Sequence, residues 1–184
     1  MKRKKGKILP IRIVGDKILR QKARLVERID PEIKEFVYDL IETMYEKDGV
    51  GLAAPQVGKS IRIFVVDPFW FKEGYEKEPK VFINPVFKEF NGESEGEEGC
   101  LSLPDIYAHV TRAENVQIEA LNEKGEKVKY QADGLFARAL QHEYDHLEGI
   151  LFIDKVSKLK RISFSKKLKE LKKNTNEKGE NISY

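Results

Sequence analysis

The sequence has little cysteine, histidine or tryptophan: one Cys, three His and one Trp in 184 residues. A lone cysteine excludes an internal disulfide and suits a reducing compartment, where the thiol stays available as a ligand. No apolar run approaches the ~20 residues of a membrane-spanning helix. The basic start, residues 1–7, is followed by too short an apolar stretch for a signal peptide. We therefore expect a cytoplasmic protein.

The composition indicates one globular domain. Hydrophobic residues make up 40% and aromatic residues 10% of the chain, which is ordinary for a domain that buries a single core. No repeat and no linker to a second domain is present. We expect a basic extension at 1–7, one domain over 8–173 that ends in a basic helix, and a disordered polar tail at 174–184.

Charge is segregated along the chain although the net charge is only +3. Residues 1–7 carry five Lys/Arg and no acid, and residues 155–173 carry nine Lys/Arg and one Glu, so the body between them is acidic. Basic ends fit an anionic partner such as ribosomal RNA. A solvated helix face is the commoner interpretation of a Lys-rich run.

The most specific motif is His142-Glu143-Tyr144-Asp145-His146. In a helix, side chains four residues apart lie on one face about 6 Å apart, so both imidazoles can bind one divalent cation. Glu143 lies one position around the helix, where a carboxylate can reach a water beside the ion without binding the ion. This arrangement is typical of a metal-assisted hydrolase.

A third ligand is needed, and it must lie upstream. No histidine follows the motif, and the first acidic residues after Gly149 are Asp154 and Glu170. Cys100, preceded by Gly99, is the candidate. One thiolate and two imidazoles leave a coordination position for water, which distinguishes a catalytic site from a closed structural one.

The elements that carry these residues follow from local patterns. Asp30-Pro31 predicts the start of a helix that runs to about Lys47, and residues 135–147 predict the helix of the motif. The segments 61–66 and 80–84 are interpreted as strands. The period-two alternation of 115–121, followed by a turn at 123–126, predicts a hairpin from 115 to 132. The loop at 67–79 holds four aromatic residues that either line a substrate rim or, more commonly, form a satellite hydrophobic cluster.

A third block, Gly49-Val50-Gly51-Leu52-Ala53-Ala54-Pro55-Gln56, completes a family pattern. Together with Glu98-Gly99-Cys100-Leu101-Ser102 and the run from Gln141 to Gly149, it resembles the peptide deformylases, whose three motifs match here in order at every fixed position. The resemblance covers roughly residues 8–172. It implies an α+β fold in which antiparallel sheets surround a buried metal-binding helix, followed by a C-terminal helix.

The resemblance also implies an activity: metal-dependent removal of the formyl group from the N-terminal formyl-methionine of nascent polypeptides. The metal ligands would be Cys100, His142 and His146, with Glu143 as general base. The side-chain amide of Gln56 and the backbone N–H of Leu101 would stabilise the oxyanion. The substrate-binding residues it implies are Val50, Gly51, Leu135 and Ala139.

Other residues near these motifs receive structural interpretations. We expect Glu98 and Arg112 to form an ion pair that holds the Cys100 loop, Arg138 to form a structural salt bridge, and His109 to play no part in the metal site. Where some relatives carry an arginine that binds the substrate backbone, this chain has Tyr107.

The ligand set leaves the metal open, because Cys, His and His accept Fe(II), Zn(II), Ni(II) or Co(II). The family favours Fe(II). Two other functions fit a metal-binding helical motif, namely a zinc endopeptidase and a ribosome- or RNA-binding protein with a structural metal. The first needs a downstream ligand and the second a fourth protein ligand, and neither is evident. No DNA or membrane partner is expected, whereas the ribosome is a candidate partner through the basic helix.

Overall fold

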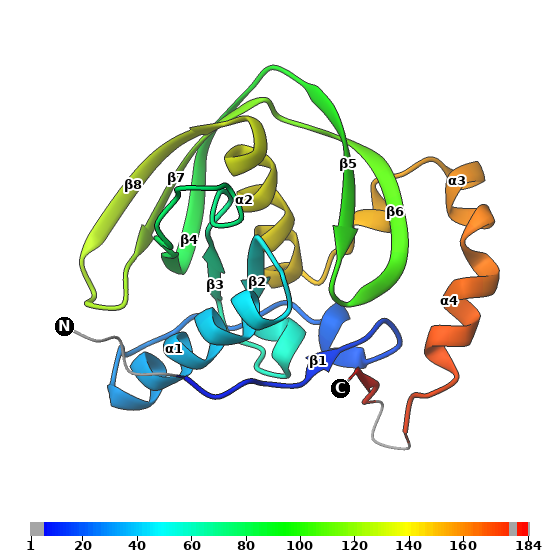
Figure 1. The fold of residues 1–184 in the computed structure, drawn as a ribbon, viewed down its shortest axis with the longest axis horizontal. Coiled ribbons are helices and arrows are strands. Elements are labelled where there is room, and N and C mark those ends of the chain that lie inside the picture. The colour runs from blue at the N-terminus through cyan, green and yellow to red at the C-terminus, as the bar shows by residue number, and fades with distance from the viewer. Residues whose placement is uncertain (1–5, 177–179, 184) are drawn as a thin grey trace.

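The computed structural model describes residues 6–176 and 180–183 (Figure 1). Its centre is an antiparallel five-stranded sheet in the order β2-β3-β4-β7-β8. The strands are β2 (Gly51–Ala53), β3 (Ile63–Val66), β4 (Lys80–Asn91), β7 (Asn115–Leu121) and β8 (Lys127–Asp133). The expected strands and the 115–132 hairpin are therefore confirmed, and β4 extends further than its apolar pattern predicts.

Two helices cover opposite faces of this sheet. They are α1 (Pro31–Glu46) and α2 (Gly134–Leu147). The side chains of β3 point alternately to the two faces. Ile63 and Val65 pack in the hydrophobic cluster that contains residues of α1, whereas Phe64 and Val66 pack in the cluster that contains residues of α2. Because strand side chains alternate and β3 is buried on both sides, its sequence is a continuous apolar run.

The start of α1 confirms the signal in the sequence. Asp30 has an extended backbone, and its carboxylate accepts a hydrogen bond of 2.9 Å from the Ile33 N–H. Pro31 occupies the first helical position, where its missing N–H costs no hydrogen bond. The cap fixes where the chain enters α1. The helix ends at Glu46, next to the Gly-rich segment that leads into β2.

A second hairpin stands apart from the central sheet. It consists of β5 (Ser94–Cys100) and β6 (Leu103–Arg112), and it was not predicted. Buried and exposed residues alternate along β6. The pairing shifts register between Glu98 and Cys100, and such an irregularity bends a strand and redirects its side chains. The Cys100 thiol is thereby turned towards α2.

Short 3-10 turns connect these elements. They are η1 (Lys17–Arg20), η2 (Ala54–Val57) and η3 (Phe152–Asp154). In η2 the backbone turns directly after β2, which buries Gln56. No described helix is long and apolar enough to span a membrane.

The C-terminal basic segment forms two helices where one was expected. They are α3 (Lys158–Ser163) and α4 (Ser165–Lys172), separated at Phe164. Phe164, Leu168 and Leu171, spaced at i, i+4 and i+7, are partly buried and pack against the core. In Figure 1 these helices lie beyond the β5–β6 hairpin, away from the sheet.

The first and last strands of the described residues lie side by side. The strands β1 (Ile11–Arg12) and β9 (Ile182–Ser183) pair antiparallel. Asn181 is buried, and its amide donates hydrogen bonds to the carbonyls of Val14 and Leu171. The sequence suggested a disordered tail over 174–184; instead, backbone pairing and this amide hold part of it. Residues 177–179 and 184, and residues 1–5 of the expected extension, lie outside the described residues.

Candidate active site

Helix α2 presents two imidazoles on one face, as the spacing of the motif predicts. The ring centroids of His142 and His146 lie 5.1 Å apart. His146 is 1% exposed, and α2 packs against β2 and β3 on one side. The two rings are therefore held by a helix that is itself fixed in the core.

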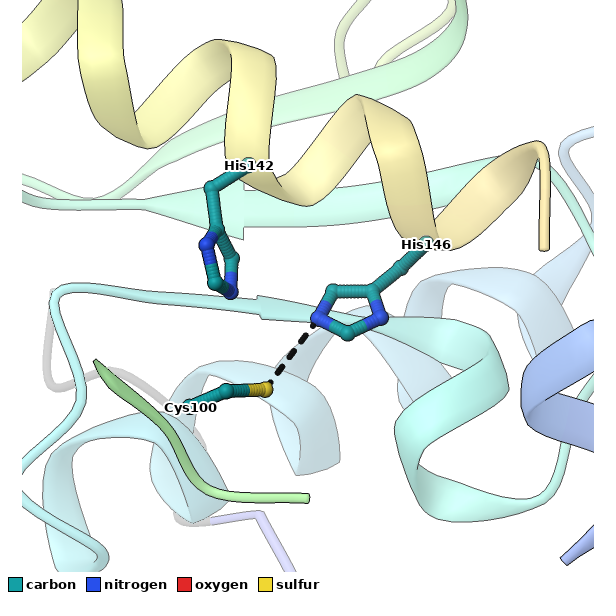
Figure 2. Close-up of side chains that lie close together, drawn as sticks. All are labelled: Cys100, His142 and His146. Atoms are coloured by element: carbon teal, nitrogen blue, oxygen red, sulfur yellow. Dashed lines mark hydrogen bonds between the residues drawn. The ribbon is translucent and has the colours of Figure 1, made fainter. Parts of the chain in front are cut away.

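The thiol of Cys100 meets these rings from the end of β5 (Figure 2). Its Sγ lies 3.4 Å from Nε2 of His146. One potential ligand atom from each of the three residues lies within 4.8 Å of the others. A Cys and two His at this separation form an open set that fits a four-coordinate cation with one position for a non-protein ligand.

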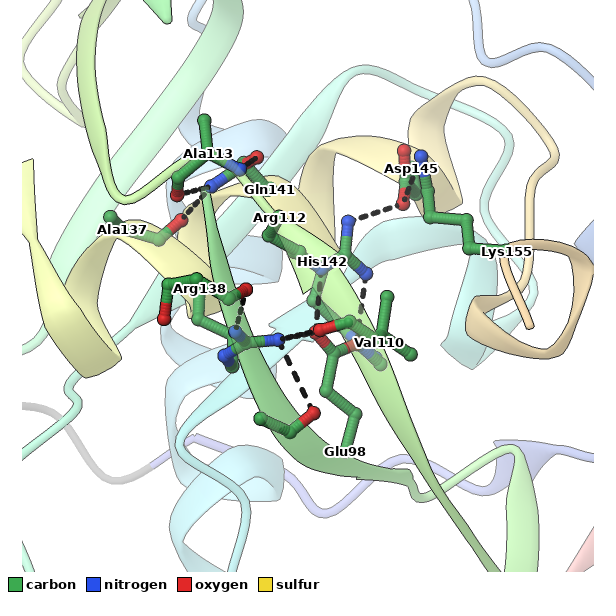
Figure 3. A network of polar contacts seen from close by, with 12 residues as sticks. Glu98, Val110, Arg112, Ala113, Ala137, Arg138, Gln141, His142, Asp145 and Lys155 are labelled. Atoms are coloured by element: carbon green, nitrogen blue, oxygen red, sulfur yellow. Dashed lines mark hydrogen bonds and ion pairs between the residues drawn. The ribbon is translucent and has the colours of Figure 1, made fainter. Parts of the chain in front are cut away.

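A buried ionic network holds His142 (Figure 3). Nδ1 of His142 lies 2.9 Å from a carboxylate oxygen of Glu98. Arg112 donates two hydrogen bonds to Glu98, of 2.6 and 2.8 Å, and a third of 2.7 Å to Asp145. With Nδ1 engaged, Nε2 of His142 is left to face Cys100 and His146. The expected Glu98–Arg112 pair is confirmed.

Arg138 has the structural role expected for it. Its guanidinium donates to Glu98 at 2.8 Å, to the Val110 carbonyl at 2.8 Å and to the Ser94 carbonyl at 2.8 Å. These bonds connect α2 to both strands of the β5–β6 hairpin. The hairpin that carries Cys100 is thus tied to the helix that carries the histidines.

The charges around the site favour a bound cation. Burial would raise the pKa of Glu98, but hydrogen bonds from Arg112 and His142 hold that pKa far below its usual range. Burial and the neighbouring His142 and Arg112 charges lower the pKa of His146 well below its usual value, so this ring is neutral and able to act as a ligand. For His142, burial is outweighed by bonds to Cys100 and Glu98, which raise its pKa. The site therefore already stabilises positive charge at His142.

Glu143 is buried beside this group without a full set of partners. It is 4% exposed, and one of its carboxylate oxygens has no hydrogen-bond partner among the described residues. Burial raises its pKa to about 7, because removal from water disfavours the charged form. A carboxylate that titrates near neutral pH can both accept and return a proton.

The Gly-rich block places backbone and amide groups against these residues. A Cβ on Gly51 would lie only 2.6 Å from Oε1 of Glu143. Gln56 accepts a hydrogen bond from the Ala53 N–H at 2.9 Å, which orients its amide; the NH₂ group then lies 3.4 Å from Cys100 Sγ and 3.3 Å from Ser102 Oγ. The amide donor therefore points into the site.

A pocket of about 460 Å³ opens onto this group. Its lining includes all of the substrate-binding residues suggested by the sequence and also Gln56, Cys100, Leu101, His142 and Glu143. His146 lies behind the wall, and His109 projects from the outer face of β6, away from the other two histidines. Three acidic residues that no motif marks in the sequence also line the pocket, namely Asp48, Glu97 and Asp105.

The aromatic loop at 67–79 forms the satellite cluster that was the commoner expectation. Trp70 meets Tyr45 edge to face with 5.5 Å between ring centroids, and its indole N–H donates to the Gly49 carbonyl at 2.9 Å. Phe69 and Tyr75 pair similarly at 6.1 Å. None of the loop's residues lines the pocket, so the loop supports the Gly-rich segment from outside.

Comparison with known proteins identifies this arrangement. The model of the polypeptide deformylase family matches residues 8–162. This chain belongs to that family. The peptide deformylase of Neisseria gonorrhoeae is 51% identical over 160 residues, covering 87% of this chain and 93% of that protein.

Solved deformylase structures share the fold. A peptide deformylase from Legionella pneumophila superposes with a TM-score of 0.83 at 42% identity, covering 90% of this chain and 96% of the other. A deformylase from Synechococcus elongatus, solved in complex with actinonin, gives 0.80 at 39% identity and covers 90% and 91%. The α+β deformylase fold is thus confirmed.

The family settles the class of reaction. The protein is a metallohydrolase that removes the formyl group from the N-terminal formyl-methionine of nascent polypeptides and releases formate. A metal ion is part of this chemistry, and Cys100, His142 and His146 are the group of described residues that can hold one. The endopeptidase and structural-metal alternatives are therefore not supported.

Proposed function

We propose that this deformylase binds its metal ion through Cys100, His142 and His146 and uses Glu143 to transfer the proton. The observation that carries the proposal is the convergence of three ligand atoms within 4.8 Å beside a buried carboxylate in one pocket. A divalent ion held there supplies a polarising charge, which lowers the pKa of a water from ~15.7 towards 7.

Glu143 performs the proton transfers of the hydrolysis. Its pKa of about 7 lets it accept a proton from the attacking water at neutral pH. The same carboxyl then returns that proton to the leaving amine of the methionine, since an unprotonated amine anion is a poor leaving group. One carboxylate oxygen of Glu143 has no hydrogen-bond partner among the described residues. This oxygen is available to accept a hydrogen bond from the attacking water.

Two donors stabilise the negative charge on the formyl oxygen. They are the side-chain NH₂ of Gln56, oriented by its bond to the Ala53 N–H, and the backbone N–H of Leu101, the residue after the thiol. Each donor is typically worth ~3 to 4 kcal/mol of barrier. Because Gln56 is 2% exposed, its amide is shielded from competing water.

The methionine side chain occupies the apolar wall formed by Val50, Leu135 and Ala139. An unbranched thioether fits such a wall without a polar partner. The peptide backbone runs along Val50 and Gly51 and adds a strand at this edge, because β2 is the terminal strand of the sheet. Backbone pairing accepts many sequences after the first residue.

We assign Fe(II) as the physiological metal and Zn(II), Ni(II) or Co(II) as substitutes, because a thiolate with two imidazoles accepts all four ions. The test is metal analysis of protein purified without oxygen, paired with turnover of formyl-Met-Ala-Ser. Iron at one equivalent with formate release supports the proposal. Zinc at one equivalent with full turnover would overturn the choice of iron, and formate release without any metal would overturn the site.

The enzyme works in the cytoplasm, with the ribosome as its partner, and helices α3 and α4 form the docking surface. The exposed cations of these helices are Lys158, Lys160, Arg161, Lys166, Lys169 and Lys172. A group of exposed Lys and Arg side chains suits RNA phosphates. Residues 8–173 then act as one catalytic domain that carries its own docking helices, with 1–7 and 174–184 as extensions.

A further inference from the structure

The aromatic loop at 67–79 binds the backbone of the pocket wall. Two successive carbonyls of the Gly-rich segment accept hydrogen bonds from this loop. The indole N–H of Trp70 donates to the Gly49 carbonyl at 2.9 Å, and the backbone N–H of Asp67 donates to the Val50 carbonyl at 2.9 Å. Gly49 and Val50 line the pocket, whereas no residue of the loop does. The loop therefore acts on the pocket only through the segment that it holds.

These bonds determine which backbone groups face a substrate. The strand β2 is the terminal strand of its sheet, and its Gly51 lies opposite Val66 of β3. Hydrogen-bonded and non-hydrogen-bonded residue pairs alternate along an antiparallel ladder. Because Val50 is bonded to Asp67, Gly51 falls in a non-hydrogen-bonded pair and turns its N–H and C=O towards the free edge. A peptide strand can pair on that side.

Gly49 decides how this edge is oriented. Its N–H donates to the Met44 carbonyl at the end of α1, at 2.9 Å, and its own carbonyl is held by Trp70. Glycine has more backbone freedom than any other residue. Without the indole bond, the peptide plane between Gly49 and Val50 could rotate, and the outward groups of Gly51 would move with it.

Trp70 is itself held in place by its neighbours. Its ring meets Tyr45 edge to face, with 5.5 Å between centroids, and the Lys77 ammonium lies 4.3 Å from the Tyr45 centroid and 5.1 Å from that of Trp70. The Tyr45 hydroxyl donates to the buried Asp67 carboxylate at 2.7 Å. The same carboxylate accepts a bond of 2.8 Å from the Glu78 N–H, which joins the two ends of the loop. The indole is thus a fixed donor.

We infer that Trp70 is a positioning residue for the peptide: its indole N–H holds the Gly49 carbonyl so that the edge of β2 is formed before the substrate arrives. This inference rests on the proposed function, since it assumes that the peptide backbone adds a strand along Val50 and Gly51. A preformed edge lowers the cost of ordering that binding otherwise incurs. Trp70 does not line the pocket, so its bond acts on capture of the peptide and not on the chemical step.

The experiment measures kcat and KM of Trp70→Phe and of the unmodified enzyme on formyl-Met-Ala-Ser and on formyl-methionine amide. Phenylalanine keeps an aromatic ring against Tyr45 but has no N–H for Gly49. We expect KM for formyl-Met-Ala-Ser to rise about three- to tenfold, the effect of one hydrogen bond, while kcat stays unchanged. KM for the amide should rise less, because this substrate has no chain beyond the methionine to pair along the edge.

Tyr75→Phe is the matched control, since it removes one polar group from another ring of the same loop, a ring that pairs with Phe69; its KM should equal that of the unmodified enzyme. Tyr45→Phe removes the donor to Asp67, should shift KM in the same direction as Trp70→Phe, and carries the same test if Trp70→Phe does not fold. Unchanged KM in both of these variants would overturn the inference, as would a fall in kcat or an equal factor for the two substrates.

The unmodified enzyme separates this inference from the proposed function. If its KM is no lower for formyl-Met-Ala-Ser than for formyl-methionine amide, the peptide does not pair along β2 and that part of the proposed function fails. If the peptide has the lower KM and Trp70→Phe leaves it unchanged, only this inference fails.

Discussion

Gly51 and Glu143 touch across the active site, with the position of a Gly51 Cβ only 2.6 Å from the Glu143 carboxylate. A methyl group cannot occupy that space unless Glu143 moves. We therefore expect Gly51→Ala to destabilise the fold by about 1 to 3 kcal/mol through overpacking and to reduce turnover. The measurement is urea denaturation with formyl-peptide kinetics.

A double variant tests the cause of that destabilisation. Glu143→Ala removes the atoms that the new methyl group meets, so Gly51→Ala should cost much less stability in its presence. Such coupling is the non-additivity expected of residues in contact. Equal costs of Gly51→Ala in both backgrounds would show that the contact does not explain the glycine.

The metal ligands should act as one unit. We expect replacement of Cys100, His142 or His146 by Ala to lower bound metal from one equivalent to a small fraction and to abolish deformylation, because two ligands hold an ion weakly. Metal analysis and formate release measure both effects. His109→Ala is the control, since this histidine lies outside the group. Full metal content and activity in Cys100→Ala would disprove the assignment.

Glu143→Gln should separate the chemistry from the fold. Glutamine has nearly the same shape but cannot accept the proton, so kcat should fall by a factor on the order of 10² to 10⁴, while metal content and thermal stability stay close to those of the unmodified protein. Glu148→Gln, at the end of the same helix and outside the pocket, should retain turnover. Near-normal turnover in Glu143→Gln would contradict the role of general base.

Acid stability should depend on Glu148. Its burial would raise its pKa, but hydrogen bonds from Arg62 and Lys22 lower that pKa below its usual value. Such a group stabilises the fold above its unfolded pKa of ~4.3 and loses this contribution as the pH falls through the folded value. The unmodified protein should thus exceed Glu148→Gln in free energy of unfolding at pH 6 to 7, and this difference should shrink towards pH 3. Denaturation across this range tests it, with Glu95→Gln as an exposed control showing no such trend.

The docking surface on α4 can be tested without removing it. Deletion of residues 158–184 would also remove β9 and the buried Asn181, so charge reversal is the cleaner change. Lys166→Glu with Lys169→Glu should weaken salt-dependent co-sedimentation with ribosomes severalfold and leave turnover of a short neutral formyl peptide unaffected.

The matched control reverses two exposed lysines, Lys124 in the turn between β7 and β8 and Lys127 at the start of β8. It changes the net charge equally and should sediment like the unmodified enzyme. Equal loss in both double variants would mean that net charge, and not this surface, governs binding.

Local signals explain which parts of the fold could be predicted. Asp30-Pro31 marks α1, the motif marks α2, and the alternation on both sides of Gly125 marks the β7–β8 hairpin, because each signal lies within the element that it predicts. The strand β5 has no such signal. Its sequence, Ser-Glu-Gly-Glu-Glu-Gly-Cys, lacks the branched and aromatic residues typical of strands. It is a strand because its backbone pairs with β6.

The same distinction applies to the site. Cys100, His142 and Glu143 could be selected as candidates from the sequence, because their motifs are local and chemically specific. Asp48 and Glu97 could not be selected, since they are ordinary surface acids in the sequence and only the fold brings them both to the lining of the pocket. The break at Phe164 likewise has no signal, because neither Gly nor Pro is present there and the apolar spacing continues across it.

The pairing of β1 with β9 makes the packing of α4 depend on a distant part of the chain. The Ile13 N–H binds the Asn181 carbonyl, and the Asn181 amide binds the carbonyls of Val14 and Leu171. Asn181 and Val14 lie 167 positions apart in the sequence, so a long loop of chain must close before these bonds can form. The helix α4 is therefore anchored to the β1 segment and not only to its neighbours in the sequence.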